Sequence, residues 1–233
     1  MYHRIWPAQQ DGLTLTPEQL REQWLYLKQE GYTALSMPAF LAIARGEKPA
    51  PKKAVLLTFD DGYRNNLTYV YPLLQELGWC ATIFIIGNTL DGTASAEGEL
   101  INEKLTVAEL RSFDPTIIQL ALHGYGHENF SKHAAEELEV IMQQSYRAFR
   151  EAGIPFEPVL AYPYGSRPKD TAVMGAMKKA FRDGGLSAAF RIGNKPQRIP
   201  AADLYELKRI DIRGEDTLED FKIKLRKGKL KPF

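Results

Sequence analysis

The alternation of short apolar runs with capped, amphipathic stretches constrains the fold of this chain more than any other feature. It repeats about seven times along the 233 residues, with no internal sequence repeat. Strands are predicted at residues 2–6, 32–35, 54–57, 80–86, 117–122, 159–162, 187–190 and 207–212. Helices are predicted at residues 17–30, 37–45, 67–77, 105–113, 133–152, 168–183 and 217–226.

Strand–helix alternation is typical of a parallel sheet whose helices cover its faces. We therefore expect an α/β fold whose sheet closes into a barrel, in a single domain over residues 1–233. An open doubly wound sheet is the structural alternative. No Gly-x-Gly-x-x-Gly follows a predicted strand, which argues against a dinucleotide site.

Local signals mark two helix starts. Thr16 and Gln19 predict a capping box, with Pro17 in the first helical position. Asn65 and Asn66 precede the apolar run 67–77 and predict a cap for that helix. The polar stretch 87–103 has no periodicity, and its length favours a rim or lid over a site.

Composition excludes several classes of protein. The net charge is +1, so nothing favours nucleic acid or an anionic membrane as a partner. No apolar run approaches the roughly 20 residues that span a bilayer, and no signal peptide is visible. Cys80 is the single cysteine, which excludes an intrachain disulfide and a cysteine-based zinc site. We expect the basic run 222–231 to be the solvated face of a last helix, with contact to an anionic surface as the alternative.

Four predicted strands end on polar or special residues. These ends are His3, the pair Asp60-Asp61, the pair His123 and His127, and the turn 163–165. In a parallel barrel the carboxyl ends of all strands meet at one face, which is where α/β barrels carry their active sites. We therefore expect these groups to form one site.

The two histidines and one acid have the chemistry of a metal site. His123 and His127 are spaced i, i+4, although Gly124 and Gly126 favour a tight loop over a regular helix. With Asp61 they form a set of two nitrogens and one oxygen that leaves positions open for water and substrate. Asp60 would be the neighbouring base and His3 an opposing acid. The alternative is an Asp that caps a helix, a solvated Asp, one histidine in a loop and one that caps a helix.

Three motifs resemble a known family. Thr58-Phe59-Asp60-Asp61-Gly62, His123-x-x-x-His127 and Tyr162-Pro163-Tyr164-Gly165 occur in the order seen in polysaccharide deacetylases of the NodB-homology type, carbohydrate esterase family 4. Tyr2-His3-Arg4-Ile5 is similar to the early motif of the circularly permuted branch, the poly-N-acetylglucosamine (biofilm polysaccharide) deacetylases. The resemblance implies a distorted (β/α)7 barrel of the glycoside hydrolase/deacetylase type and a divalent metal. Zn²⁺ is the metal expected first, with Co²⁺, Ni²⁺ or Mn²⁺ as alternatives.

The resemblance also implies roles for individual residues. Asp60 matches the catalytic base and His3 the catalytic acid, while Asp61, His123 and His127 match the metal ligands. The turn at Pro163 and Tyr164 matches the groove wall, with the Tyr164 amide as the oxyanion donor.

Three features depart from the family pattern. Gly124 replaces a Ser or Thr that braces the histidine loop, and Ala161 replaces the Arg that holds the base. Arg209 could substitute for that Arg, with a solvated side chain as the alternative. The strand that leads to His3 has only Met1 and Tyr2 in front of the histidine.

The expected activity is hydrolysis of acetyl groups on an N-acetylated, or alternatively O-acetylated, carbohydrate. Hydrolysis of a non-sugar amide or cyclic imide at the same site is one alternative, because fold does not fix substrate. An inactive relative that binds a glycan or a partner protein is another. The resemblance implies the cell envelope or periplasm, whereas the sequence as given carries no signal for export; it does not determine the oligomeric state.

Overall fold

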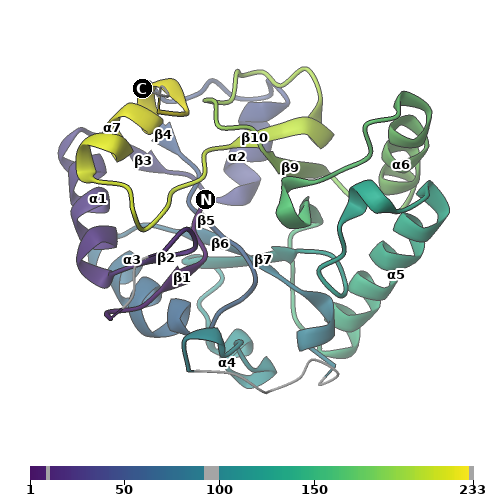
Figure 1. Cartoon of the computed structure of the whole chain (residues 1–233), viewed down its shortest axis with the longest axis horizontal. Helices are drawn as coiled ribbons and strands as arrows, with labels where there is room; N and C mark the ends of the chain where they lie inside the picture. The colour runs from purple at the N-terminus through teal and green to yellow at the C-terminus, as the bar shows by residue number, and fades with distance from the viewer. Residues whose placement is uncertain (9–10, 92–99, 231–233) are drawn as a thin grey trace.

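The computed structural model describes residues 1–8, 11–91 and 100–230. At its centre is a six-stranded sheet in the order β10-β9-β8-β7-β6-β5, with every neighbouring pair parallel (Figure 1). Its strands are β5 (Thr58–Phe59), β6 (Ala81–Ile85), β7 (Ile118–Leu122), β8 (Val159–Ala161), β9 (Ala188–Ile192) and β10 (Leu207–Arg209). The expected parallel α/β architecture is therefore confirmed.

Two small parallel sheets flank the central one. They pair β1 (Arg4–Ile5) with β2 (Thr14–Leu15), and β3 (Thr33–Ala34) with β4 (Ala54–Val55). Tyr2 forms a separate parallel bridge to Phe59 of β5. The strand predicted over residues 2–6 is thus divided between this bridge and β1.

Helices cover the outside of the sheet. They are α1 (Pro17–Gln29), α2 (Met37–Ala44), α3 (Tyr71–Leu77), α4 (Val107–Ser112), α5 (Ala135–Glu151), α6 (Thr171–Asp183) and α7 (Leu218–Lys227). The capping box predicted at Thr16 is present, since Thr16 accepts from the Gln19 amide while the Gln19 side chain accepts from the Thr16 amide. Helix α1 thus begins at Pro17, where the sequence predicts it.

The helix predicted over residues 67–77 begins differently. A π-helical stretch, η1 (Asn66–Val70), precedes α3, and neither Asn65 nor Asn66 caps it with a side-chain hydrogen bond. The predicted cap is therefore wrong. Both amides instead bind the N-terminal segment: Asn65 accepts from the Ile5 amide, and Asn66 donates to the carbonyl of His3.

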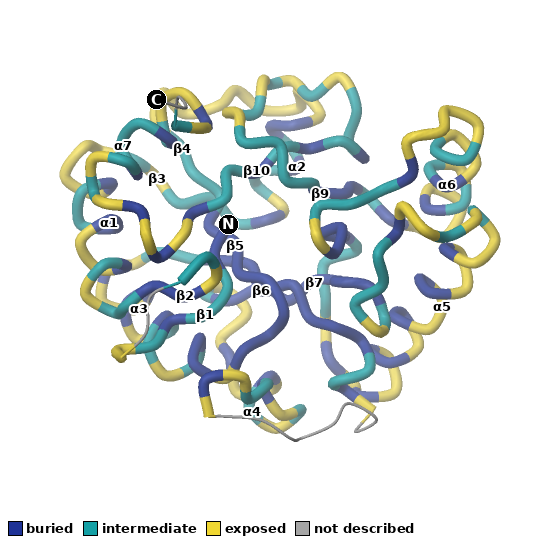
Figure 2. The backbone as a smooth tube through the Cα atoms, viewed as in Figure 1, coloured by how far each residue is buried: buried dark blue, intermediate teal, exposed yellow. Residues whose placement is uncertain are grey.

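The core follows the strands. Figure 2 shows β5, β6 and β7 buried throughout, whereas the helices alternate buried and exposed turns. Among the described residues, no helix is long and apolar enough to cross a membrane. A rim or lid is expected over residues 87–103, and part of this stretch lies outside the described residues. Its described part contains two short 3₁₀ turns, η2 (Gly87–Thr89) and η3 (Leu100–Asn102).

Candidate active site

The strand ends bring the candidate residues together at one edge of the sheet. Asp60 and Asp61 directly follow β5, His123 follows β7, and the turn η5 (Pro163–Gly165) comes shortly after β8. Asp61, His127 and Tyr164 have positive φ angles of 71°, 61° and 58°. Non-glycine residues rarely adopt this left-handed region, and such strain gathers at functional sites.

The three expected metal ligands converge on one point. Nε2 of His123 and Nε2 of His127 lie 3.2 and 3.3 Å from Oδ1 of Asp61. Each residue offers one ligand atom, and these atoms lie within 4.8 Å of one another. Two imidazole nitrogens and a carboxylate oxygen in this arrangement suit a divalent cation of the zinc type.

The protonation of His123 explains why a cation fits here. Its Nδ1 lies 2.8 Å from the carbonyl oxygen of Ala161, which accepts the Nδ1 proton. A neutral His123 then turns an unprotonated Nε2 toward Asp61, whose Oδ1 is buried and has no hydrogen-bond donor in the described structure. Two electron-rich atoms at this distance repel unless a proton or a metal ion lies between them.

The pKa shifts of His123 and Asp61 also show that the site favours positive charge. Burial lowers the pKa of His123, but the carboxylates of Asp60 and Asp61 outweigh burial and raise it above its ordinary value. Burial raises the pKa of Asp61, but the neighbouring imidazoles of His123 and His127 outweigh burial and hold it well below its ordinary value. The site therefore keeps its acid ionised and attracts a cation.

Arg209 contacts Asp60 directly. Its Nη1 and Nη2 donate to Oδ1 and Oδ2 of Asp60 at 2.6 and 2.7 Å, and both side chains are buried. Burial raises the pKa of Asp60, but the guanidinium outweighs it and lowers the pKa to about 2. Ala161, where the family carries an arginine, is a buried strand residue whose carbonyl binds His123.

His3 lies beside the acid pair. The Tyr2 carbonyl accepts from the Asp60 amide, so the chain enters the site next to this carboxylate. Burial lowers the pKa of His3, against the opposing effect of Asp60 and Asp61. Its Nδ1 is buried without a hydrogen-bond partner among the described residues. Burial thus disfavours the charged imidazole, whereas the two nearby acids favour it.

The turn after β8 forms another wall of the site. Pro163 is buried, whereas Tyr164 is 64% exposed. The Tyr164 ring lies 4.4 Å from the His127 ring, centroid to centroid. A Cβ on Gly165, which has a φ of +63°, would approach Ile192 to 2.7 Å, so this turn requires glycine.

Glu128 braces the histidine loop, a role that the sequence did not suggest. Its carboxylate accepts from the amides of Tyr125 and Gly126 at 3.1 and 2.6 Å. Gly124 has a φ of +75°, and a Cβ there would lie 2.8 Å from Glu128 Oε2. A glycine at 124 and a carboxylate at 128 therefore fit together, and they supply bracing that a Ser or Thr would otherwise give.

Comparison with known proteins places this geometry in a family. The polysaccharide deacetylase family profile matches residues 47–180. A poly-β-1,6-N-acetyl-D-glucosamine N-deacetylase of Escherichia coli K12 is 39% identical over 90 residues, which are 39% of this chain and 13% of that protein. The chain therefore matches only a small part of that relative.

Solved structures share the fold. Streptococcus pyogenes deacetylase PplD, solved with acetate, has a TM-score of 0.76 at 20% identity, covering 97% of this chain and 96% of its own. IcaB from Ammonifex degensii has a TM-score of 0.75 at 18% identity, and the match covers 95% of this chain and 91% of the IcaB chain. Together with the profile match, which extends over more than half of the residues, these findings show that the chain belongs to the polysaccharide deacetylase family.

Proposed function

We propose that this protein is a metal-dependent deacetylase that hydrolyses the acetamide of N-acetylated sugars in a polysaccharide of the poly-N-acetylglucosamine type. The observation that carries the proposal is the convergence of Asp61, His123 and His127 beside an Asp60 that Arg209 keeps ionised. A site of this composition combines a cation position with a separate acceptor for a proton. The E. coli relative named for poly-β-1,6-N-acetyl-D-glucosamine supports this choice of glycan.

Asp61, His123 and His127 would hold the metal, with Zn²⁺ proposed first. A bound divalent cation supplies Lewis-acid polarisation of the acetyl carbonyl and makes water more acidic. Because Nδ1 of His123 bonds to the Ala161 carbonyl, its Nε2 is fixed as the ligand atom. Both imidazoles and Oδ1 of Asp61 already face one another, so little rearrangement is needed on binding.

Asp60 and His3 would move the protons. At neutral pH Asp60 is ionised, because its pKa is about 2, and it would therefore orient the attacking water and accept its proton. His3 would protonate the nitrogen of the leaving sugar amine. Both groups lie beside the ligand set: Asp60 Oδ2 is 4.0 Å from Nε2 of His123, and the Asp60 amide donates to the carbonyl of Tyr2, the residue before His3.

The η5 turn would contact the reacting acetyl group. We assign the Tyr164 main-chain amide to the oxyanion and buried Pro163 to the groove wall. The left-handed backbone at Tyr164 supports this assignment, because strained turns re-aim main-chain donors. The exposed Tyr164 ring next to His127 offers a flat apolar surface to a sugar.

We also propose that the sheet belongs to a distorted (β/α)7 barrel that forms one domain over residues 1–233. The segment Met1–Tyr2 supports this, since Tyr2 bonds to Thr58 and Asp60 while Met1 bonds to Ile210 and Ile212. It therefore stands between β5 and the chain that follows β10.

The departures at Ala161 and Gly124 would favour an inactive binder, but two contacts support an enzyme instead. Arg209 contacts Asp60, the residue that the missing arginine at 161 would hold, and Glu128 braces the loop at Gly124. Cell-envelope location stays a prediction from the family.

Acetate release from β-1,6-linked N-acetylglucosamine oligomers tests the proposal, with Zn²⁺, Co²⁺, Ni²⁺ or Mn²⁺ added to chelator-treated protein. We expect Asp60→Asn to abolish turnover while keeping the metal, and His123→Ala to lose the metal. His133→Ala is the matched control, because His133 pairs with Glu137 at a helix start outside the ligand set. Full activity of either site variant would refute the assignment. Turnover of small amides or cyclic imides, with none on the oligomers, would move the proposal to that substrate class.

A further inference from the structure

The stretch of chain that carries Arg209 contacts the site at two places. It begins with the 3₁₀ turn η6 (Leu204–Glu206) and continues through β10. Arg209 of β10 binds Asp60, whereas Glu206, which directly precedes β10, binds the chain that follows the η5 turn. One continuous stretch thus contacts both the proposed base and the turn that carries the proposed oxyanion donor.

The carboxylate of Glu206 lies between two arginines. Nε and Nη2 of Arg167 donate to its Oε1 and Oε2, each at 2.6 Å, and Nε of Arg191 in β9 lies 2.9 Å from the same Oε2. The three side chains are 21–26% exposed, so water and salt screen these charges less than those of a surface pair. A two-pronged contact between a guanidinium and a carboxylate fixes direction as well as distance.

The η5 turn rests on η6 from both of its flanks. Tyr162 directly precedes the turn and is buried, and its hydroxyl donates to the Tyr205 carbonyl at 3.1 Å. The Tyr162 amide donates to the Phe190 carbonyl of β9 at 2.9 Å. Arg167 follows the turn and binds Glu206, the residue after Tyr205. A hydroxyl contact on one flank and an ion pair on the other therefore fix the turn.

The turn needs support from outside because its backbone is strained. Tyr164 has a φ of 58°, and such a conformation persists only where the surrounding structure fixes it. Within the turn, the Gly165 amide donates to the Tyr162 carbonyl at 2.8 Å and the Ser166 amide to the Pro163 carbonyl at 3.0 Å. The exchange of these two amides with solvent reports whether the turn keeps its shape.

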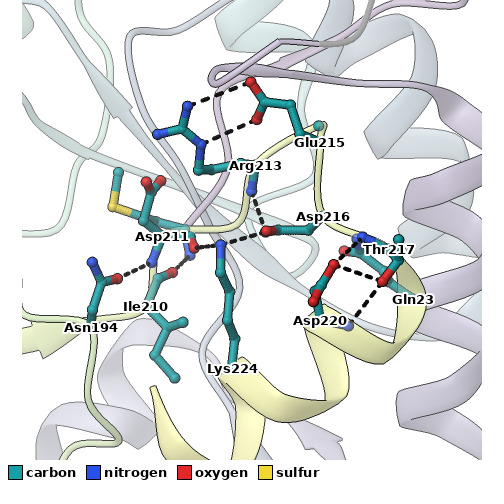
Figure 3. A network of polar contacts seen from close by, with 12 residues as sticks. Gln23, Asn194, Ile210, Asp211, Arg213, Glu215, Asp216, Thr217, Asp220 and Lys224 are labelled. Atoms are coloured by element: carbon teal, nitrogen blue, oxygen red, sulfur yellow. Dashed lines mark hydrogen bonds and ion pairs between the residues drawn. The ribbon is translucent and has the colours of Figure 1, made fainter. Parts of the chain in front are cut away.

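The far end of the stretch is fixed as well. Figure 3 shows Lys224 of α7 reaching the chain just beyond β10, where its Nζ donates to the Asp211 carbonyl at 3.0 Å and to Asp216 Oδ2 at 2.5 Å. The Asp211 amide donates to Asn194 Oδ1 at 2.9 Å. Glu206 therefore belongs to a stretch that is held firmly at its other end. This buried Lys224 also corrects the expectation that the basic run of α7 is wholly solvated.

We propose that Glu206 is a positioning residue, which acts through Arg167 to hold the η5 turn, and with it the Tyr164 amide, in a fixed place relative to Asp60. The inference rests on the proposed function in one respect, which is that this amide meets the oxyanion. Because Glu206 and Arg209 belong to one stretch, they set the base and the oxyanion donor against the same support. Small displacements of such groups are costly to catalysis.

The first measurement is amide hydrogen exchange, which needs no substrate. Glu206→Gln keeps the size of the side chain but leaves Arg167 and Arg191 as neighbouring positive charges without their carboxylate. We expect exchange at the Gly165 and Ser166 amides to become at least tenfold faster. Tm and zinc content are measured on the same samples, and zinc content should not change because Glu206 is outside the ligand set.

Lys178→Met is the matched control. Lys178 of α6 pairs at 2.6 Å with Asp203, whose side chain caps η6, so its loss disturbs the same turn without removing the link to Arg167. Exchange at the two η5 amides should stay within twofold. Arg167→Met breaks the link from the other side and should match Glu206→Gln, so it serves as the test if that variant does not fold. Arg167→Lys keeps the charge and should lose less.

The second measurement is acetate release from the β-1,6-linked oligomers. A donor that meets the oxyanion only in the transition state affects kcat, so we expect kcat to fall about tenfold in Glu206→Gln while KM stays within about twofold. If Glu206 acts through Arg167, the double variant of Glu206→Gln and Arg167→Met should be no slower than Glu206→Gln alone, because both changes remove one contact.

Unchanged exchange at the two η5 amides in Glu206→Gln would overturn the proposal. So would losses of kcat that multiply in the double variant, or an equal loss of kcat in Lys178→Met, which would indicate a general loosening of η6. Absence of acetate release by the unsubstituted protein would refute the proposed function instead. The exchange measurement would then still decide whether Glu206 holds the turn.

Discussion

Arg209 and Asp60, which are 149 positions apart in the sequence, form a buried two-pronged ion pair with N–O distances of 2.6 and 2.7 Å. Each oxygen of the carboxylate accepts one guanidinium N–H, and a weaker contact of Nη1 reaches the Thr58 hydroxyl at 3.4 Å. Removing one partner of such a pair leaves an uncompensated buried charge, which is far more costly than losing an exposed pair.

Replacing Arg209 with methionine should therefore destabilise the protein and alter the base. We expect a loss of about 3–5 kcal/mol in the free energy of unfolding at pH 7. The pKa of Asp60 should rise, so activity should fall more at pH 5 than at pH 8. Thermal unfolding and a pH profile of kcat/KM measure the two effects. Arg213→Met is the control, because its ion pair with Glu215 is exposed and should matter by under about 1 kcal/mol. Equal stability of the two variants would contradict the prediction.

The unsubstituted protein should lose stability in acid through the same pair. Asp60 has a folded pKa of about 2, below the unfolded value of about 3.9. Its contribution is therefore fully present above about pH 4 and is lost as the pH falls toward 2, at about 2–3 kcal/mol. Denaturant unfolding between pH 2 and 5 measures this loss. In Asp60→Asn the slope over that range should be smaller, and an unchanged slope would show that other groups control acid unfolding.

His123 should give the metal-free protein the opposite dependence. Its folded pKa is raised above the ordinary value, so its protonation stabilises the fold fully below the unfolded pKa of about 6.5 and ceases to do so as the pH rises through the folded pKa. Chelator-treated protein should lose Tm as the pH rises from 6 to 8. Zinc-loaded protein should not, because the metal replaces the proton. Parallel Tm–pH curves for the two forms would argue against His123 as a ligand.

Glu128 should control how well the loop presents its histidines. Glu128→Ala removes both acceptors of the Tyr125 and Gly126 amides, so we expect zinc affinity to fall by about 10–100-fold. Glu128→Gln keeps one acceptor and should lose less. Competition with a chromogenic chelator gives the affinities, and exposed Glu139→Ala serves as the control. Wild-type affinity in Glu128→Ala would mean that the loop holds its shape unaided.

The parts of the site that are local to strand ends could be predicted from the sequence. Asp61, His123 and His127 each follow a recognisable buried strand, and parallel strands bring their carboxyl ends to one edge. The contact of Arg209 with Asp60 could only be suggested, since it depends on how β10 lies across the molecule from β5. The parallel α/β sheet followed from the same alternation of strands and helices.

Other features depend on partners that no local pattern identifies. Asn65 and Asn66 have the sequence context of a helix cap, but long-range partners at Ile5, Ile101 and His3 take their side chains. Glu128 accepts from amides within its own loop, and the need for it is visible only once the backbone of Gly124 is known. In both cases tertiary contacts outweigh the intrinsic preference of the residue.

The asparagine contacts lead to the last prediction, which concerns His3. Asn66 Nδ2 donates to the His3 carbonyl at 3.0 Å, so Asn66→Ala frees the backbone that positions the proposed acid. We expect kcat to fall about tenfold, with a loss of about 1–3 kcal/mol in stability, because a partly buried carbonyl loses its donor. Zinc content should not change, since the ligand set does not include this segment. Exposed Gln144→Ala on α5 should keep wild-type kcat, and its activity measured beside that of Asn66→Ala separates positioning of His3 from a general effect of losing an amide. If Asn66→Ala keeps full kcat on the glycan while His3→Ala does not, then Tyr2 and its pairing to β5 are sufficient to hold the histidine.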